Sequence, residues 1–213
     1  FIAFLDVDDW WHSNKLDLQI PLFKDSEIGL VYGNLFRFFT KKNKKKIYRN
    51  ILPKGNILDD LLKDYVIGSP TYVIRKKALE SLKYFFDDRF HIIGDFDLNL
   101  RIASKWKVDC LQNPIATARI HGKNESLIKK SKEVEELKIW YNEMKNNDFF
   151  SSNVSLNYIK LKILYLETIR AIKESRLKDS VSMIIKYPFS FTKIKLIIIF
   201  LLPKFLWKKI QDY

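Results

Sequence analysis

The chain has 213 residues, of which 47% are hydrophobic and 30% are charged, so it can form a packed core and is not disordered throughout. Its single cysteine, Cys110, excludes an internal disulfide framework and a cysteine-rich zinc module. Lysine and arginine outnumber acidic residues by 38 to 25, which gives a net charge of +13 and indicates an anionic partner or simply high solubility. No apolar run reaches about 18 residues, so we expect no membrane span.

The chain begins with the continuously apolar run Phe1–Leu5, which ends at an acidic cluster formed by Asp6, Asp8 and Asp9. Such a run is typical of a strand that is buried on both faces in the middle of a parallel sheet. A strand of this kind needs neighbours on both sides, and the sequence does not begin with methionine. We therefore expect this to be the later part of a longer chain whose upstream strands are missing.

The segments that follow alternate between helical and strand-like patterns. We expect a helix that begins near Asn14 and buries a stripe of Leu16, Ile20 and Phe23. The other expected elements are a hairpin over residues 28–48 with a lysine-rich tip at 41–46, helices over 57–62, 76–82 and 94–106, and strands over 71–74, 108–111 and 116–120.

Helical periodicity dominates after about Glu125. We expect helices over residues 133–144 and 154–175, with Ser151 and Ser152 as candidate caps of the second. The predicted fold class is therefore α/β, with a helical C-terminal extension after the α/β body.

The acidic cluster is the sharpest chemical feature of the sequence. Ligands of open α/β sheets bind at the carboxyl ends of strands, where Asp6, Asp8 and Asp9 are expected to lie. Neighbouring carboxylates repel one another unless a cation joins them, and Mg²⁺ and Mn²⁺ prefer oxygen ligands. The plainer alternative is a solvated acidic turn that caps the next helix. The apolar strand before the cluster and the pair Trp10–Trp11 after it favour the functional interpretation.

These residues resemble the Asp-x-Asp region of family 2 glycosyltransferases with the GT-A fold, and further segments resemble later motifs of that family in the same order. The matching segments are Phe4–Trp11 with Asn14–Leu16 and Gln19, then Val31–Asn34, Gly68–Thr71 with Val73–Lys76, Gly94–Leu98 with Leu100–Arg101, and Arg119–Asn124 with Ser126. Gly94 departs from the pattern, because many members carry glutamate there. The helical tail carries no comparable signature.

The resemblance implies two domains. Residues 1–126 correspond to the C-terminal part of a GT-A domain, a Rossmann-like mixed sheet with flanking helices, without the N-terminal nucleotide-binding part. Residues 127–213 form a helical extension with a basic amphipathic tail.

The resemblance also implies roles for individual residues. Asp8 would bind a Mn²⁺ or Mg²⁺ ion that neutralises the leaving diphosphate, and His121 would close over this metal. Asp6, Asp9 and Trp10 would bind the donor. Asp95 would be the general base that deprotonates the acceptor hydroxyl.

Each of these residues also has a plainer interpretation. Asp95 could be a helix N-cap, His121 a surface or packing residue, and at least one of Trp10 and Trp11 a core residue. Arg101 is expected to form a structural ion pair with a carboxylate, and the lysine-rich tip at 41–46 is expected to be solvated.

The implied function is an inverting glycosyltransferase of bacterial surface polysaccharide synthesis. It would transfer a sugar from a nucleotide-diphosphate donor to a saccharide or lipid-linked acceptor. One alternative is a Mg²⁺-dependent phosphatase of the haloacid dehalogenase type, although Trp10 stands where that family has threonine or valine. The other is an inactive truncated remnant or a basic binding module. We expect no nucleic-acid partner, because the basic residues are scattered and form no recognised motif.

The tail over residues 187–213 combines lysines with aromatic and aliphatic residues. Its apolar core, Leu196–Leu202, is too short to cross a bilayer of about 30 Å. We expect an interfacial segment that attaches a cytoplasmic protein to an anionic membrane surface, on the inner face of the cell membrane. The alternative is a helix that packs against the rest of the protein and leaves its lysines in water.

Overall fold

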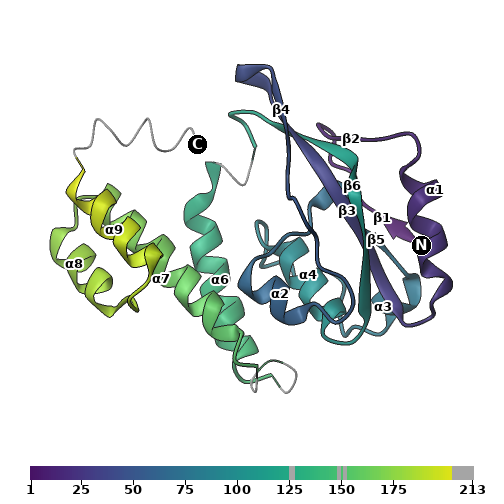
Figure 1. Cartoon of the computed structure of the whole chain (residues 1–213). Helices are drawn as coiled ribbons and strands as arrows, with labels where there is room; N and C mark the ends of the chain where they lie inside the picture. Colours follow the sequence, from purple (N-terminus) through teal and green to yellow (C-terminus); the bar gives the residue numbers. More distant parts are fainter. Residues whose placement is uncertain (125–127, 148–149, 151–152, 203–213) are drawn as a thin grey trace. The chain divides into compact units, whose positions relative to one another are not determined.

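The computed structural model describes residues 1–124, 128–147, 150 and 153–202. It has a mixed α/β fold with C-terminal helices, as predicted (Figure 1). Contacts divide the chain into two compact units, Phe1–Leu156 and Asn157–Tyr213. The first unit therefore includes the helix that follows residue 126. The division into domains at that residue, which came from the family resemblance, stays a prediction.

A mixed sheet forms the centre of the first unit. β3 and β6 pair in parallel along their length, and the other paired strands are antiparallel. The order of the strands is β1-β5-β3-β6-β2, and β4 pairs with β3 as a hairpin. The strands are β1 (Ile2–Ala3), β2 (Trp10–Trp11), β3 (Ile28–Phe39), β4 (Lys44–Ile47), β5 (Val73–Ile74) and β6 (Lys107–Ile120).

The strands of this chain do not place the first strand in the middle of a sheet, and the upstream neighbours expected for it stay a prediction. β1 lies at one end of the sheet order and pairs with β5 in the antiparallel direction. Phe1 and Leu5 are largely exposed, so the run is not buried on both faces. An apolar run of this length is equally compatible with an edge strand whose ends lie outside the ladder.

The two strands predicted over 108–111 and 116–120 form one strand, β6, with an irregular middle. Gly33 pairs with Leu111 and Asn34 pairs with Pro114, so β6 carries extra residues between these two pairs. The Asn34 side chain donates hydrogen bonds to the carbonyl oxygens of Gln112, at 3.1 Å, and Arg49, at 2.6 Å. This amide satisfies backbone groups that the bulge removes from the ladder.

Helices cover both faces of the sheet. α1 lies on one side, whereas α2 and α4 lie on the other (Figure 1). The hairpin and the helices of the first unit were predicted, with differences of a few residues at their ends. The helices of this unit are α1 (Lys15–Gln19), α2 (Leu58–Lys63), α3 (Lys76–Glu80), α4 (Gly94–Ala103) and α6 (Lys130–Met144).

The buried face of α1 differs from the predicted stripe. Phe23 is buried as predicted, but Leu16 and Ile20 are exposed, and the buried residues of α1 are Lys15 and Gln19. The Gln19 amide nitrogen donates to the carbonyl oxygens of Val31, at 3.0 Å, and Thr71, at 2.8 Å, which explains why a polar residue is buried there. The Lys15 amine lies 4.3 Å from the centre of the Trp11 ring.

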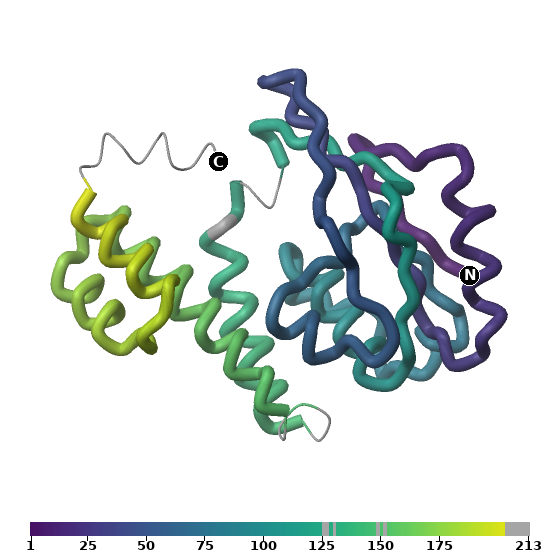
Figure 2. The backbone as a smooth tube through the Cα atoms, in the orientation of Figure 1, coloured from purple at the N-terminus to yellow at the C-terminus, as the bar shows by residue number. Residues whose placement is uncertain are grey.

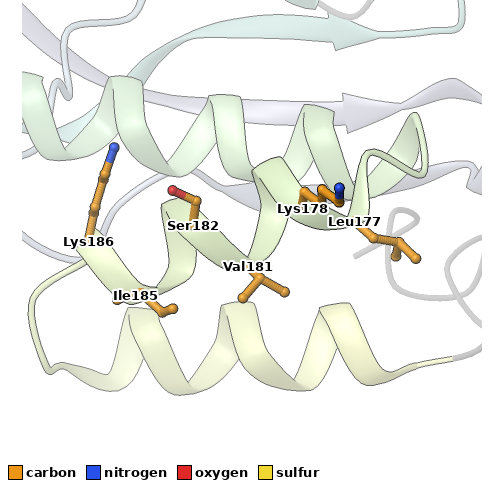
Figure 3. Close-up of a pocket in the computed structure, with 6 residues that line it drawn as sticks. All are labelled: Leu177, Lys178, Val181, Ser182, Ile185 and Lys186. Carbon is orange, nitrogen blue, oxygen red and sulfur yellow. The ribbon is translucent and has the colours of Figure 1, made fainter.

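The second unit consists of α7 (Leu156–Lys173), α8 (Leu177–Lys186) and α9 (Phe191–Leu201), shown in green to yellow in Figure 2. Its core contains Ile172, Ile184, Tyr187 and Leu196. α8 also carries a surface pocket lined by Leu177, Lys178, Val181, Ser182, Ile185 and Lys186 (Figure 3).

None of the helices in the described part of the chain has the length and apolar character needed to cross a membrane. Three predictions fall outside the described residues: the caps Ser151 and Ser152, Ser126 of the last family motif, and the end of the tail from Pro203 onward.

Candidate active site

The acidic loop, defined here as residues 6–9 between β1 and β2, is tied to the end of β6. Trp10 pairs with Thr117, and the backbone nitrogen of Arg119 donates to Oδ1 of Asp9 at 2.8 Å. Within the loop, the Asp9 nitrogen donates to the Asp6 carbonyl at 3.1 Å. β6 therefore holds the loop beside the turn that follows it.

That turn brings His121 to Asp8. Nε2 of His121 lies 2.6 Å from Oδ2 of Asp8. The backbone nitrogen of Lys123 donates to Nδ1 of the same ring at 3.1 Å, so in the neutral ring the proton is on Nε2 and is donated to Asp8. Oδ1 of Asn124 accepts from the His121 nitrogen and holds the turn. The sequence resemblance placed both residues at one site, and the structure brings them together.

The Asp8–His121 pair meets part of what a divalent metal ion requires. Within the described ranges of the chain, no group of three or more histidine, cysteine, aspartate or glutamate side chains is arranged to hold a metal ion. Mg²⁺ usually takes only one or two protein carboxylates and completes its shell with water and substrate phosphate. Asp8 fits such a ligand. His121 would have to move its proton from Nε2 to Nδ1 and lose the hydrogen bond from Lys123.

The other carboxyls of the loop are unfavourably placed as anions. Restricted solvation raises the pKa of Asp6, and the negative charge of Asp8 raises it further, although a hydrogen bond with Ser69 opposes this. Restricted solvation also raises the pKa of Asp9, against the lowering effect of its hydrogen bond with Arg119. A cation bound among these carboxylates would relieve their repulsion.

Asp95 lies in the first turn of α4 rather than at its cap. Ile93 occupies the N-cap position, so the N-cap interpretation was wrong. Oδ1 of Asp95 accepts from the Phe96 nitrogen at 2.7 Å, and its carboxylate also hydrogen-bonds to the Tyr65 hydroxyl. Burial raises the pKa of Asp95 to about 6, and the negative charge of Asp6 contributes to this shift.

Tyr72 links Asp95 to the acidic loop. Burial raises the pKa of Tyr72 first, and the charges of Asp95 and Asp6 raise it further, so its hydroxyl is within electrostatic reach of both carboxylates. Its ring also packs 5.4 Å from the ring of Phe4, at the start of the loop. Asp8 therefore contacts His121 directly, whereas Asp6 and Asp95 influence one another through their charges.

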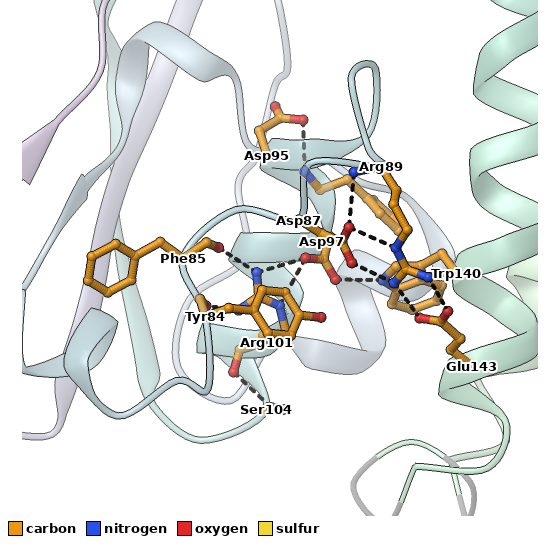
Figure 4. Close-up of polar contacts among 11 residues, drawn as sticks. Tyr84, Phe85, Asp87, Arg89, Asp95, Asp97, Arg101, Ser104, Trp140 and Glu143 are labelled. Atoms are coloured by element: carbon orange, nitrogen blue, oxygen red, sulfur yellow. Dashed lines mark hydrogen bonds and ion pairs between the residues drawn. The ribbon is translucent and has the colours of Figure 1, made fainter.

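Asp97, two residues from Asp95, belongs to a different environment. Its side chain is fully buried, and Oδ2 accepts from Nε and Nη2 of Arg101 at 2.9 and 2.7 Å. Oδ1 accepts from Nε1 of Trp140 at 2.9 Å (Figure 4). Arg101 thus forms the expected structural ion pair, and Asp97 has no oxygen free to act as a base.

Trp10 is 37% exposed, and its ring stands edge-on to Phe38, with the Arg119 guanidinium 5.4 Å from its centre. Trp11 is half-buried beside Lys15. Only Trp10 therefore offers an accessible ring beside the acidic loop, as donor stacking would require.

The lysine hairpin, residues 40–47, borders the same turn. The pairing of β3 with β6 runs as far as Phe39 and Ile120, and the hydroxyl of Thr40 donates to the Ile120 carbonyl at 3.3 Å. The Lys41 amine lies 4.0 Å from the position that a Cβ on Gly122 would take. The hairpin places positive charge beside His121.

Some site residues were missed from the sequence. Tyr65 and Tyr72 carry no local signal, because their proximity to Asp95 depends on how α2 and β5 pack against α4. Ser69 was part of a matched family segment, but nothing indicated that it would bond to Asp6.

No family model matches this chain. Over 86 residues, however, it is 34% identical to UDP-Glc:alpha-D-GlcNAc-diphosphoundecaprenol beta-1,3-glucosyltransferase WfgD of Escherichia coli. The chain is glycosyltransferase-like. The matched region covers 40% of this chain and 33% of the relative, so the chain spans about a third of the length of that protein. The assignment to family 2 and the GT-A fold stays a prediction.

Proposed function

We propose that this chain forms part of an inverting glycosyltransferase of polysaccharide synthesis. It would transfer a sugar from a nucleotide-diphosphate sugar to a saccharide or lipid-linked acceptor. Two observations support this proposal: Nε2 of His121 lies 2.6 Å from Oδ2 of Asp8, and the negative charge of Asp6 contributes to the raised pKa of Asp95. The similarity to a glucosyltransferase with a lipid-linked acceptor supports it.

In this mechanism Asp95 takes the proton from the acceptor hydroxyl. Its pKa of about 6 leaves it largely ionised at neutral pH and still basic enough for proton transfer. The acceptor oxygen forms a bond to the anomeric carbon while the bond from that carbon to the diphosphate oxygen breaks. A single displacement inverts the configuration and needs one base and no protein nucleophile. The Tyr65 hydroxyl holds the carboxylate in place.

Asp8 would hold the Mn²⁺ or Mg²⁺ ion, with His121 beside it, and the ion would supply positive charge to the departing diphosphate. Asp6 and Asp9 flank this position and would orient the donor through its ribose or sugar hydroxyls. Trp10 would offer its exposed ring to the donor.

The proposal is tested by incubating the full-length protein with UDP-glucose, Mn²⁺ and a synthetic lipid carrying N-acetylglucosamine diphosphate. We expect labelled glucose in the lipid product, with loss of product in Asp8→Asn and retention in the control Asp17→Asn on α1. Absence of transfer from UDP-glucose and from other nucleotide sugars would contradict the proposal. Phosphate incorporated into Asp6 from a phosphate ester would support the phosphatase instead.

We also propose that the second unit attaches the protein to an anionic membrane surface at the inner face of the cell membrane. One face of α9 is ordinary core, because Leu196 is fully buried. The other face remains open, with Phe191 at 92% and Leu201 at 72% exposed. α8 adds the exposed side chains of Val181 and Ile185 beside Lys186 (Figure 3). Exposed apolar side chains next to lysines suit the headgroup region.

A further inference from the structure

We propose that helix α6 positions Asp95, and that Glu136 is the positioning residue through which it does so. This inference rests on the proposed function, because it assigns a role relative to the base. α6 lies outside residues 1–126, which carry the family resemblance, so no sequence motif pointed to it.

Glu136 holds the backbone that leads into α4. Its Oε1 accepts from the His91 nitrogen at 3.1 Å, and its Oε2 accepts from the nitrogens of Ile92 and Ile93 at 2.8 and 3.1 Å. The residue is only 5% exposed. Hydrogen bonds to an ionised acceptor are stronger than neutral ones, and a negative charge at a helix N-terminus is favourable. Only Gly94 separates this segment from Asp95.

A second contact of α6 holds the two residues that follow Asp95. Trp140, one turn after Glu136, is fully buried and donates from Nε1 to Oδ1 of Asp97 at 2.9 Å. Its ring packs edge-on against Phe96, with 5.1 Å between ring centres. α6 therefore contacts the backbone before Asp95 and the two side chains after it. Figure 4 shows Trp140 at Asp97 and Glu143 at Arg89.

Glu143 lies on the same face of α6 and pairs with Arg89, at 2.6 Å from Nη1 to Oε1 and 3.0 Å from Nη2 to Oε2. Arg89 also pairs with Asp87. Both partners of the Glu143 pair are exposed, so the pair should contribute little. Glu143 is therefore a matched control for Glu136: it has the same side chain, helix and face, but an exposed partner.

Replacing Glu136 by glutamine removes the charge and leaves one oxygen for three donors. At least one of the three N–H groups then loses its partner in a buried place, so the segment before α4 should shift. Small displacements of a catalytic group lower the rate strongly, on the order of 100-fold for about 1 Å. Donor binding at the acidic loop should not change, because Glu136 contacts none of its residues.

The test is a double-mutant cycle with Asp95→Asn in the full-length protein, using UDP-glucose and the synthetic lipid acceptor. We expect Glu136→Gln to lower kcat about 10- to 100-fold, with UDP affinity unchanged, and Glu143→Gln to lower it less than about 2-fold. In the Asp95→Asn background, Glu136→Gln should have no further effect, because its action passes through that carboxylate.

Equal losses of kcat in both backgrounds would show a general structural role and overturn the proposal, as would wild-type kcat in Glu136→Gln. If Glu136→Gln does not fold, Trp140→Phe removes the indole donor and part of the ring that packs against Phe96, and we expect a loss of kcat that also vanishes in Asp95→Asn. Failure of the wild-type protein to transfer sugar would instead contradict the proposed function.

Discussion

The carboxylates of the acidic loop and the carboxylate of Asp97 differ in how their charge is balanced. Asp97 is fully buried, but its oxygens accept bonds from Arg101 and Trp140. Asp6 and Asp9 are less enclosed, yet their pKa values are raised by restricted solvation and by neighbouring negative charge. A carboxylate whose hydrogen bonds are complete within the protein stabilises the fold. Carboxylates that repel one another beside an open surface are suited to a cationic or polar ligand.

The largest effect is expected at Asp8. Asp8→Asn removes the charge that would hold the metal but keeps the size of the side chain, so we expect a loss of transfer of about 1,000-fold or more. Excess chelator should have the same effect on the wild-type protein, and Mn²⁺ or Mg²⁺ should restore activity. A steady-state transfer assay measures both. Full activity in excess chelator would show that transfer needs no metal ion and would contradict this role of Asp8.

Asp97→Asn should affect stability rather than chemistry. It leaves the Arg101 guanidinium buried without a counter-charge, and breaking a buried ion pair costs about 3–5 kcal/mol. Denaturant unfolding measures this loss of unfolding free energy. The amide oxygen of asparagine can still accept from Nε1 of Trp140, so the contact beside Asp95 is kept. At a temperature where the variant is folded, transfer per folded molecule should therefore be near wild type, and a selective loss of kcat would show that the Asp97–Arg101 pair also acts on catalysis.

In contrast to Asp97→Asn, Asp95→Asn should lower the rate of transfer and should not lower the stability of the protein. We expect kcat to fall at least about 100-fold, because the amide does not accept the proton, while UDP affinity is unchanged. Since the native pKa is raised from 3.8 to about 6, ionised Asp95 costs the fold up to about 3 kcal/mol at neutral pH.

The size of the stability change in Asp95→Asn depends on pH. Between about pH 4 and 6 the native state binds more protons than the unfolded state, so wild-type stability falls as pH rises through this window. Asp95→Asn should therefore be more stable than wild type above about pH 6, with the difference vanishing near pH 4. Thermal unfolding of both proteins across this pH range measures the difference in their stability. A difference that does not change with pH would contradict the raised pKa of Asp95.

Many of the helices and strands of the first unit could be predicted from the sequence, because each has a local pattern of apolar residues. The apolar runs predicted β3 and the hairpin, and the apolar periodicity of the segment that begins at Gly94 predicted α4. The acidic loop and Asp95 were identified as one site only through the family resemblance. The buried face of α1 was not predictable, because the burial of Gln19 depends on the carbonyls of Val31 and Thr71.

Long-range contacts explain the other omissions. Glu136 looks like a surface residue of an amphipathic helix, and only the position of the segment before α4 makes it a buried acceptor. Tyr65 likewise gains its role from the packing of α2 against α4.

The smallest effect is expected in the second unit. Replacing Lys178 and Lys186 by glutamine should weaken binding to acidic-lipid vesicles up to about 30-fold, since each lysine near such a surface contributes about 1 kcal/mol. Added salt should weaken wild-type binding in the same direction. The matched control replaces Lys63 and Lys77, which are exposed on the first unit. Equal pelleting of all forms would show that α8 and α9 do not bind membranes.

The pH dependence of sugar transfer tests the central claim most directly, namely that the acidic loop and Asp95 form one catalytic site. The account predicts that kcat/KM of the wild-type protein rises tenfold per pH unit below about pH 6 and levels off above it, because Asp95 must be ionised to accept the proton. It also predicts that this rise disappears in Asp95→Asn and persists in Glu143→Gln. A profile with the same rise in Asp95→Asn would contradict the account, because another group would then be the base.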